Sequence, residues 1–325
     1  MTTRRALLLS VGAIALGAAR QGSAQPATRV YRVAIATVAP RSAPFNVAME
    51  RRFRELGYVE GKNFAIEFRA LGSQLAKLPE VSAALSRDRP DVVIVTGSEI
   101  VLRAFRQAMG TTPIVMIAVN FDAVEKNFIA SLARPGGNIT GVVFREVESA
   151  AKRLDLLREA LPKATRIAAL FDFATRDQLH ATEEAAKKLG ITVLPYEMRG
   201  DPYDFVAALA AAAKAKAQAV QALSSASFFL LRDQMIGAAH KHRLPVFANP
   251  NYAEAGALVS FGASFPHMYA RAAEYSDRIM KGAKPAEMPV EQPTKFELIV
   301  NLKTAKTLGI TIPPSVLLRA DRIIE

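Results

Sequence analysis

Short apolar runs alternate along the chain with longer segments whose apolar residues recur every three to four positions. Phe45, Met49, Phe53 and Leu56 follow the second pattern, and their spacing places them on one face of a helix that ends at Gly57. The uninterrupted apolar run at 114–119 is typical of a strand buried on both faces of a parallel sheet. This alternation predicts an α/β fold in which helices cover parallel strands.

The alternation occurs in two series, which predict two similar α/β lobes. The first series predicts strands at 30–38, 64–71, 92–96 and 114–119, and helices at 45–57, 75–87 and 101–109. The second predicts strands at 141–144, 167–171, 191–196, 219–223, 246–248, 258–261 and 296–301, and helices at 151–161, 182–189, 205–216, 269–281 and before 309. A turn cluster at 134–137 separates the two series.

The first 24 residues have the pattern of a secretory signal peptide. Arg4 and Arg5 precede an apolar run at 6–19 that only Ser10 interrupts, and small residues lead to a cleavage site after Ala24. The run is shorter than the roughly 20 residues that span a bilayer as a helix. We expect export to the periplasm by the general or the twin-arginine route, and an uncleaved anchor is the alternative.

Composition excludes several kinds of chemistry. The chain has no cysteine, which rules out disulfides, thiolate nucleophiles, cysteine zinc sites and a lipidated cysteine anchor. Its net charge of +12, from 42 Lys and Arg against 30 Asp and Glu, permits anionic partners but does not indicate a fold or an activity. Basic residues scattered over a solvated surface are the favoured interpretation.

The usual cofactor and catalytic motifs are missing from the sequence. The loop at 37–42, after the first predicted strand, has no glycine for a dinucleotide fingerprint, and neither a P-loop nor a Gly-x-Ser-x-Gly elbow occurs. His240 and His242 lie two positions apart, a spacing that on a helix points the two side chains to different sides. We predict no catalytic residue, no cofactor and no metal site.

Candidate binding residues lie in the loops after the strands, where open α/β sheets bind ligands. The loop at 96–98 precedes a helix whose free N–H groups favour an anion, although plain N-capping by Ser98 is the alternative. The loop at 224–227 is its counterpart in the second lobe, and Asp122 and Asp172 serve either a ligand or a helix N-cap. Aromatic residues that line a pocket or belong to the core surround these loops: Phe121, Phe144, Phe171, Phe173, Phe228 and Tyr252.

Four long stretches, at 53–63, 89–93, 131–141 and 292–306, contain motifs in the order found in a known family. They resemble the ABC-transporter substrate-binding proteins related to the tryptophan/tyrosine-binding type. The resemblance covers essentially the whole chain after the signal peptide.

This resemblance implies a type I periplasmic-binding fold, in which two Rossmann-like lobes with parallel sheets are joined by a three-strand hinge. The three crossings are expected near 141–145, 260–265 and 288–293. The implied domains are a signal peptide at 1–24, lobe 1 at 25–142 plus 265–288, and lobe 2 at 143–264 plus 289–325.

The resemblance also implies which positions bind the ligand. The strand-end positions of the family fall on Thr37, Thr96, Gly97, Ser98, Asn120, Asp122, Asp172, Ser225, Asn249 and Tyr252. The chain departs from the family at 172–173, where Asp-Phe replaces the common Asn-Pro, and at 121–123, where Phe-Asp-Ala replaces Gly-Asp-Pro. Both departures alter the pocket, so amino-acid specificity does not transfer.

The resemblance implies an extracytoplasmic monomer that binds a small organic solute, such as an amino acid or an aromatic acid, by hinge closure. We expect the carboxylate of the solute on the turn at 96–98, and delivery to the membrane permease of an ABC importer. An exported sensor that presents its ligand to a membrane receptor is the alternative. The export signal and the missing motifs disfavour a cytoplasmic enzyme. A DNA-binding regulator would need a helix-turn-helix in place of the signal segment, so we expect no nucleic acid partner.

Overall fold

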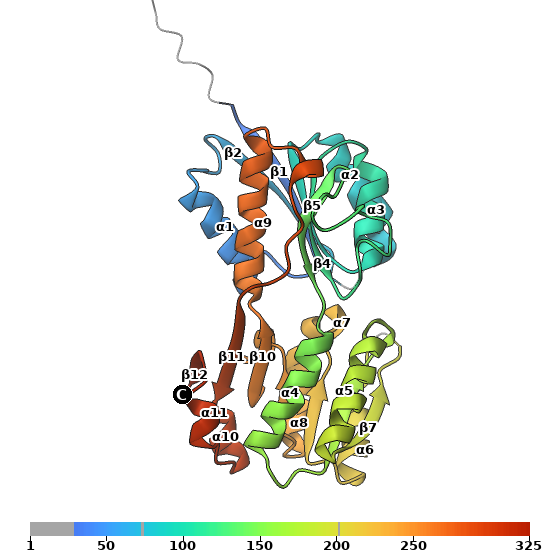
Figure 1. Ribbon diagram of the computed structural model, residues 1–325, viewed down its shortest axis with the longest axis vertical. Helices are drawn as coiled ribbons and strands as arrows, with labels where there is room; N and C mark the ends of the chain where they lie inside the picture. Colours follow the sequence, from blue (N-terminus) through green and yellow to red (C-terminus); the bar gives the residue numbers. More distant parts are fainter. Residues whose placement is uncertain (1–28, 73–74, 201) are drawn as a thin grey trace, which may run out of the picture.

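The computed structural model describes residues 29–72, 75–200 and 202–325, which form two lobes, each built around one β-sheet (Figure 1). The signal peptide predicted at 1–24 lies outside these residues. The N-terminal sheet is entirely parallel and has the strand order β2-β1-β3-β4-β5. Its strands are β1 (Tyr31–Thr37), β2 (Phe64–Ala70), β3 (Val92–Gly97), β4 (Ile114–Val119) and β5 (Ile139–Phe144).

Both faces of the N-terminal sheet are buried under helices, as its apolar strands predict. Along β1, Val33 and Ile35 pack towards α1 (Pro44–Glu55) and α9 (Phe265–Met280), whereas Ala34 and Ala36 face the opposite side. The helices on that side are α2 (Leu78–Arg87), which follows the 3-10 turn η1 (Leu75–Lys77), and α3 (Glu99–Met109). Alternation with a period of two therefore places apolar side chains in two separate cores.

The C-terminal sheet has the order β12-β11-β10-β9-β8-β6-β7. Its strands are β6 (Arg166–Phe171), β7 (Thr192–Glu197), β8 (Ala219–Ala222), β9 (Val246–Ala248), β10 (Val259–Ala263), β11 (Phe296–Asn301) and β12 (Arg322–Ile324). One face packs on α4 (Val147–Ala160), α5 (Arg176–Leu189), α10 (Leu302–Leu308) and α11 (Pro314–Leu317). The other packs on α6 (Phe205–Lys214) and α8 (Arg232–Lys241).

Short helical elements follow β6, β8, β9 and helix α9. They are η2 (Phe173–Thr175), α7 (Ala226–Leu230), η3 (Pro250–Tyr252) and η4 (Pro285–Glu287). Within the described ranges no helix is long and apolar enough to cross a bilayer.

The predicted two-lobed α/β architecture is confirmed, with local differences. The predicted parallel sheet contains one antiparallel pair, β10 with β11, because β10 leads the chain out of the C-terminal lobe and β11 brings it back. Helix α4 begins at Val147 rather than near 151, since small and polar residues in its first turn hide the apolar period. The short elements α11 and β12 were not predicted, and β12 is mostly exposed.

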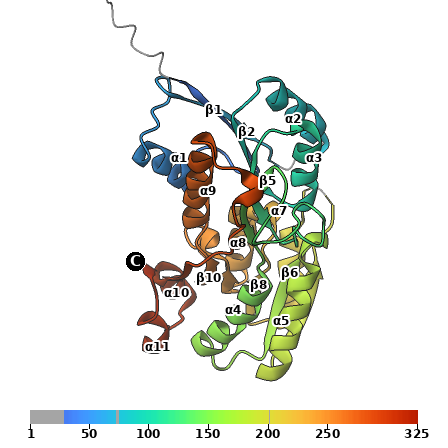
Figure 2. The same cartoon turned by 45° about the horizontal axis from the view of Figure 1, so that its top comes forward.

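The chain passes between the two lobes three times (Figures 1 and 2). The first passage joins β5 to α4, the second joins β10 to α9 through Ser264, and the third leads from η4 to β11. Backbone hydrogen bonds tie the third passage to the others: the Val143 N–H donates to the Glu291 carbonyl at 2.9 Å, and the Ser264 N–H to that of Lys295 at 2.9 Å. The three segments therefore form one connection.

A buried ion pair lies beside this connection. The Arg153 Nη1 atom of α4 donates to the Glu146 carboxylate at 2.7 Å and to the Phe261 carbonyl at 2.9 Å, and both charged side chains are 0% exposed. Burial raises the pKa of Glu146, and the positive charge of Arg153 opposes this shift. Because Glu146 ends the first passage and Phe261 precedes the second, Arg153 joins two of the three.

Replacing one partner of this ion pair leaves the other charge buried without compensation. We expect Arg153→Met to lower the free energy of unfolding by about 3–5 kcal/mol. The neighbouring Lys152, exposed and paired with Asp155, provides the matched control Lys152→Met, with an expected loss of about 1 kcal/mol or less. Urea denaturation followed by circular dichroism measures both, and equal losses would contradict a structural role for the pair.

Gly141 allows β5 to approach β4. Its φ is +131°, and a Cβ atom built there would lie 2.2 Å from the Met116 carbonyl oxygen. We expect Gly141→Ala to destabilise the protein by about 3 kcal/mol or more, because backbone atoms of β4 must move. Gly237 of α8 has open space around the corresponding position, so Gly237→Ala is expected to be neutral or slightly stabilising. Thermal denaturation of the two variants tests this contrast.

Candidate functional site

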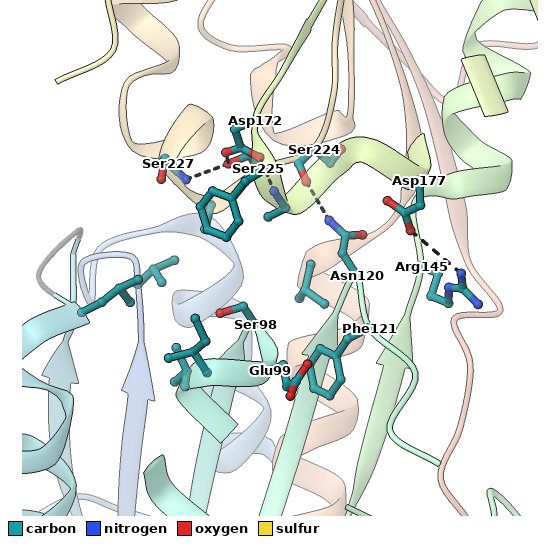
Figure 3. Close-up of a pocket in the computed structure, with 18 of the residues that line it drawn as sticks. Ser98, Glu99, Asn120, Phe121, Arg145, Asp172, Asp177, Ser224, Ser225 and Ser227 are labelled. Carbon is teal, nitrogen blue, oxygen red and sulfur yellow. Dashed lines mark hydrogen bonds and ion pairs between the residues drawn. The ribbon is translucent and has the colours of Figure 1, made fainter. Parts of the chain in front are cut away.

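A cavity of about 420 Å³ lies between the lobes, at the carboxyl ends of strands from both sheets (Figure 3). The N-terminal sheet contributes Ser98 after β3 and the segment 120–122 after β4. The C-terminal sheet contributes 172–174 after β6 and 224–227 after β8. This is where open α/β sheets bind ligands, and two such edges face each other here.

The structure brings many of the predicted residues together. Those that line this cavity are Ser98, Asn120, Phe121, Asp122, Asp172, Phe173 and Ser225. An adjoining cavity of about 60 Å³ is lined by Thr96, Gly97, Asn249 and again Ser225. Phe144 instead lines another cavity of about 240 Å³, which shares Phe121 and Asp122 with the first. Most of the predicted set thus surrounds one space.

Thr37 and Tyr252 line none of these three cavities. Thr37, the last residue of β1, is 0% exposed, and Tyr252 is 1% exposed in the core between the C-terminal sheet and its helices α6 and α8. Burial raises the pKa of Tyr252. Their place at strand ends follows the expected pattern, but their side chains point into the protein.

Asp172 is the centre of a hydrogen-bonded group on the C-terminal side of the cavity (Figure 3). Its carboxylate accepts hydrogen bonds from the Ser225 hydroxyl, from the Tyr203 hydroxyl at 3.2 Å and from the Ala174 N–H at 3.0 Å. The Ser225 oxygen in turn accepts a hydrogen bond from the Ser227 N–H at 3.2 Å. Asp172 therefore caps η2, which is the N-capping alternative expected for it, and Ser225 caps α7.

Asn120 joins the two lobes at the floor of the cavity. Its φ of 61° is left-handed, a conformation that asparagine tolerates better than most residues. The Nδ2 atom donates to the Ser224 carbonyl at 2.7 Å, and the Oδ1 atom accepts from the Glu146 N–H at 3.2 Å. One amide side chain thus connects β4, the first passage and the loop after β8.

Asp122 is a second carboxylate of the cavity, on the N-terminal side. Its Oδ1 atom accepts hydrogen bonds from the N–H groups of Glu125 at 3.0 Å and Val124 at 2.8 Å. These hydrogen bonds lower its pKa, and the positive charges of Arg145 and Lys126 act in the same direction. Asp122 is therefore a negative charge at the cavity wall at neutral pH.

The turn at 96–98 is divided between the two cavities, with Ser98 lining the larger one and Thr96 and Gly97 the adjoining one. Thr96 is 1% exposed and its hydroxyl accepts a hydrogen bond from the Tyr269 hydroxyl at 3.2 Å. Ser98 precedes α3 without a side-chain cap, and the first helical residue is Glu99, whose carboxylate pairs with Arg103. A negative charge of the protein thus already lies at this helix N-terminus.

Sequence reasoning missed an aromatic group that bridges the lobes. Phe45 of α1 lies 4.6 Å from Tyr269 and 5.6 Å from Phe229, measured between ring centroids, and Phe265 is 5.9 Å away. All four rings line the smaller cavity. The position of Phe229, two residues after the loop at 224–227, is the sequence signal that could have found it. Phe45 was indistinguishable from the core stripe of its helix.

The family model of the ABC transporter substrate binding proteins matches residues 48–324 of the chain. The chain belongs to this family. The similarity predicted from the motifs at 53–63, 89–93, 131–141 and 292–306 is thereby confirmed.

Individual relatives of this substrate-binding protein are distant. A tyrosine-binding protein of Clostridioides difficile is 23% identical over 271 residues, which cover 80% of this chain and 75% of the relative. The structure of a conserved domain protein from Vibrio cholerae has a TM-score of 0.80 and 26% identity to this chain. The alignment covers 91% of this chain and 100% of the Vibrio protein. The ABC domain from Streptococcus pneumonia in complex with L-Trp has a TM-score of 0.79 and 21% identity, with the same coverage. The type I periplasmic-binding fold is confirmed.

The contacts of Asn120 predict its contribution to the apo protein. Asn120→Asp retains the acceptor for the Glu146 N–H but loses the donor to the Ser224 carbonyl, so we expect a loss of about 1–2 kcal/mol in unfolding free energy. Asn127 is left-handed too, with a φ of 57°, and it lies outside the cavity lining, which makes Asn127→Asp the matched control. Thermal melts compare the two, and indistinguishable midpoints would contradict the bridge.

Proposed function

We propose that this substrate-binding protein is the solute receptor of an ABC importer and binds a small organic solute, such as an amino acid or an aromatic acid, between its lobes. The observation that carries the proposal is the cavity of about 420 Å³ at the facing edges of the two sheets. Its volume falls within the roughly 300–1,000 Å³ usual for small-molecule sites. The ligand-binding residues proposed are the predicted set that lines this cavity and the adjoining one.

Binding is proposed to proceed by hinge closure about the three passages. Ile100 on the N-terminal side is 51% exposed and Phe173 on the C-terminal side is 69% exposed, and both line the cavity. A solute that contacts both lobes removes this apolar surface from water and shifts the population towards the closed form. Binding of this kind needs no covalent chemistry, which supports a receptor rather than an enzyme.

The remaining parts of the proposal concern location and partners. The signal peptide at 1–24 directs the chain to the periplasm, where a monomer delivers its solute to the permease subunits in the inner membrane. The proposed lobes are 25–142 with 265–288, and 143–264 with 289–325. The names of two relatives, which include tyrosine and L-Trp, make these amino acids the first probes.

Hinge closure is testable by fluorescence energy transfer, because the chain has no native cysteine to interfere with labelling. Val47→Cys on α1 and Val206→Cys on α6 place dyes on exposed positions of opposite lobes. We expect saturating L-tyrosine or L-tryptophan to raise transfer efficiency and to raise the melting temperature, since the ligand stabilises the folded state. If neither probe acts, a panel of other amino acids, aromatic acids, nucleosides and sugars extends the test.

The control pair is Val47→Cys with Gln107→Cys on α3, both within the N-terminal lobe. Its efficiency is expected to stay constant when the solute binds. A ligand that raises the melting temperature without altering transfer between lobes would contradict closure and leave binding intact. A full panel without any effect on protein that was unfolded and refolded to release bound ligand would contradict the receptor proposal itself.

A further inference from the structure

The third passage between the lobes is attached to the N-terminal lobe as far as Glu291. The Glu291 N–H donates to the Gly141 carbonyl of β5 at 2.9 Å, and the Glu291 carbonyl accepts from the Val143 N–H at 2.9 Å. Before it in the chain, the Pro289 carbonyl accepts from the Tyr275 hydroxyl of α9 at 2.5 Å. The passage up to 291 is therefore held by the N-terminal sheet and by α9.

An ion-pair network fixes the side chain of Glu291 as well. Arg271 of α9 donates to the Glu291 carboxylate through Nε at 3.0 Å and through Nη2 at 2.6 Å, and we call this pair the N-terminal clamp. The same guanidinium pairs with Glu274, which accepts from the Arg52 Nε atom of α1 at 2.9 Å. Burial acts to raise the pKa of Glu291, but the hydrogen bonds and the charge of Arg271 outweigh it and lower the pKa. Bidentate geometry and a network of charges both strengthen a partly exposed pair.

The C-terminal lobe holds the passages from the other side. The buried pair of Arg153 with Glu146, which we call the C-terminal clamp, fixes the end of the first passage and also bonds to the Phe261 carbonyl before the second. The third passage reaches this lobe at Lys295, directly before β11, where its carbonyl accepts from the Ser264 N–H. Each lobe thus has its own attachment to the passages.

Between these attachments, two of the passages contain main chain without hydrogen bonds. Within the described residues, the main chain of Arg145 in the first passage and of 292–294 in the third has no hydrogen-bond partner. In the second passage the division falls within Ser264, because its N–H bonds to Lys295 and its carbonyl accepts from the Met268 N–H of α9 at 3.1 Å. Rotation about Arg145 and 292–294 therefore breaks no main-chain hydrogen bond.

Open space adjoins the same stretches. Arg145, Gln292 and Pro293 line the cavity of about 240 Å³, together with Val124 and Phe296, which are 37% and 45% exposed. A close-packed interior resists changes of torsion angle, whereas main chain beside a cavity has room to move. The cavity is thus an observation independent of the hydrogen bonds, and it indicates the same places.

We propose that the two clamps confine the rotation of the lobes to three short pivots, at Arg145, Ser264 and 292–294. Neither Arg153 nor Arg271 lines the three cavities, so both act as positioning residues that determine which torsion angles change when a solute binds. The inference rests on the proposed function, of which hinge closure is a part. It also moves the proposed lobe boundary in the third passage from 288 to 291.

Asn120 adds a restraint across this boundary. Its side chain bonds to the Glu146 N–H, next to Arg145, and to the Ser224 carbonyl of the C-terminal lobe. Both hydrogen bonds resist rotation about Arg145. Asn120 therefore affects how readily the lobes move, whereas the two clamps determine where the chain bends.

The N-terminal clamp is testable without a ligand. Dyes on Val47→Cys and Val206→Cys report the distribution of distances between the lobes by time-resolved energy transfer, on protein refolded to release bound ligand. Glu291→Gln keeps the size of the side chain but removes its charge, so the free stretch lengthens and we expect a broader distribution. Glu287→Gln breaks an exposed pair with Lys284 beside η4 and is the matched control, with no change expected.

Hydrogen exchange read at single residues gives the size of the effect. In the parent protein, the amides of Arg145 and Gln292 are expected to exchange rapidly, and those at positions 143 and 291 slowly. Glu291→Gln is expected to accelerate exchange at 143 and 291 by about fivefold, through the loss of the ion pair. Sodium chloride at about 1 M, where the Debye length is about 3 Å, is expected to act in the same direction on the parent and hardly at all on the variant.

Glycine substitutions test the pivot in the third passage. Thr294→Gly increases the torsional freedom of the free stretch, so we expect it to broaden the distribution of distances between the lobes. Thr311→Gly makes the same change in an exposed loop between α10 and α11, within the C-terminal lobe, and is expected to leave the distribution unchanged. Melting temperatures accompany each variant, and Thr294→Gly gives the result where Glu291→Gln is unstable.

The outcomes separate the clamps from closure itself. If a folded Glu291→Gln or Thr294→Gly variant leaves the distribution unchanged, or if its control broadens equally, the clamp proposal is overturned. Closure still stands in that case when saturating L-tyrosine or L-tryptophan raises transfer between the lobes. If the distance between the lobes is the same in the parent and in every variant, with and without bound solute, hinge closure fails and this inference fails with it.

Discussion

The buried guanidinium of Arg153 is the interaction that holds two of the three passages where they meet the C-terminal lobe. It bonds to Glu146 at the end of one passage and to the Phe261 carbonyl before another, and both charged side chains are removed from water. Desolvating two charges costs several kcal/mol each, which is recovered only while their geometry is maintained. The pair therefore restricts how these two passages lie relative to each other.

The position of the cleft follows from this connection. The carboxyl ends of β3 and β4 in one sheet and of β6 and β8 in the other face one another, and the cavity lies between the loops that follow them. Asn120 connects the two lobes beside the cavity, because its side-chain amide donates a hydrogen bond to the Ser224 carbonyl. Side chains that cap short helices, such as Asp172 and Ser225, are at the same time the polar wall of the cavity. The side chains that stabilise these helix ends are therefore the same side chains that line the cavity.

Much of the fold is readable from the chain because burial on both faces of a parallel sheet leaves continuous apolar runs. β4 and β9 begin and end where the runs at 114–119 and 246–248 predict, and helix α1 ends just before Gly57. The strand-end rule likewise pointed to Ser98, Asn120, Asp122, Asp172 and Ser225, which line the cavity. The short and exposed β12 gives no such signal, since its stability comes from pairing with β11.

The sequence by itself determined the order of most strands and helices, the family and the loops that carry the site, because these follow from local periodicity and contiguous motifs. The tertiary structure alone decided which side chains face the cavity: Thr37 and Tyr252 point into the core, whereas Phe45 and Phe229 from different lobes meet. It also decided the charge of the cleft, because residues from both lobes must come together before their pairing is defined. Contacts between distant segments depend on packing, which no local pattern encodes.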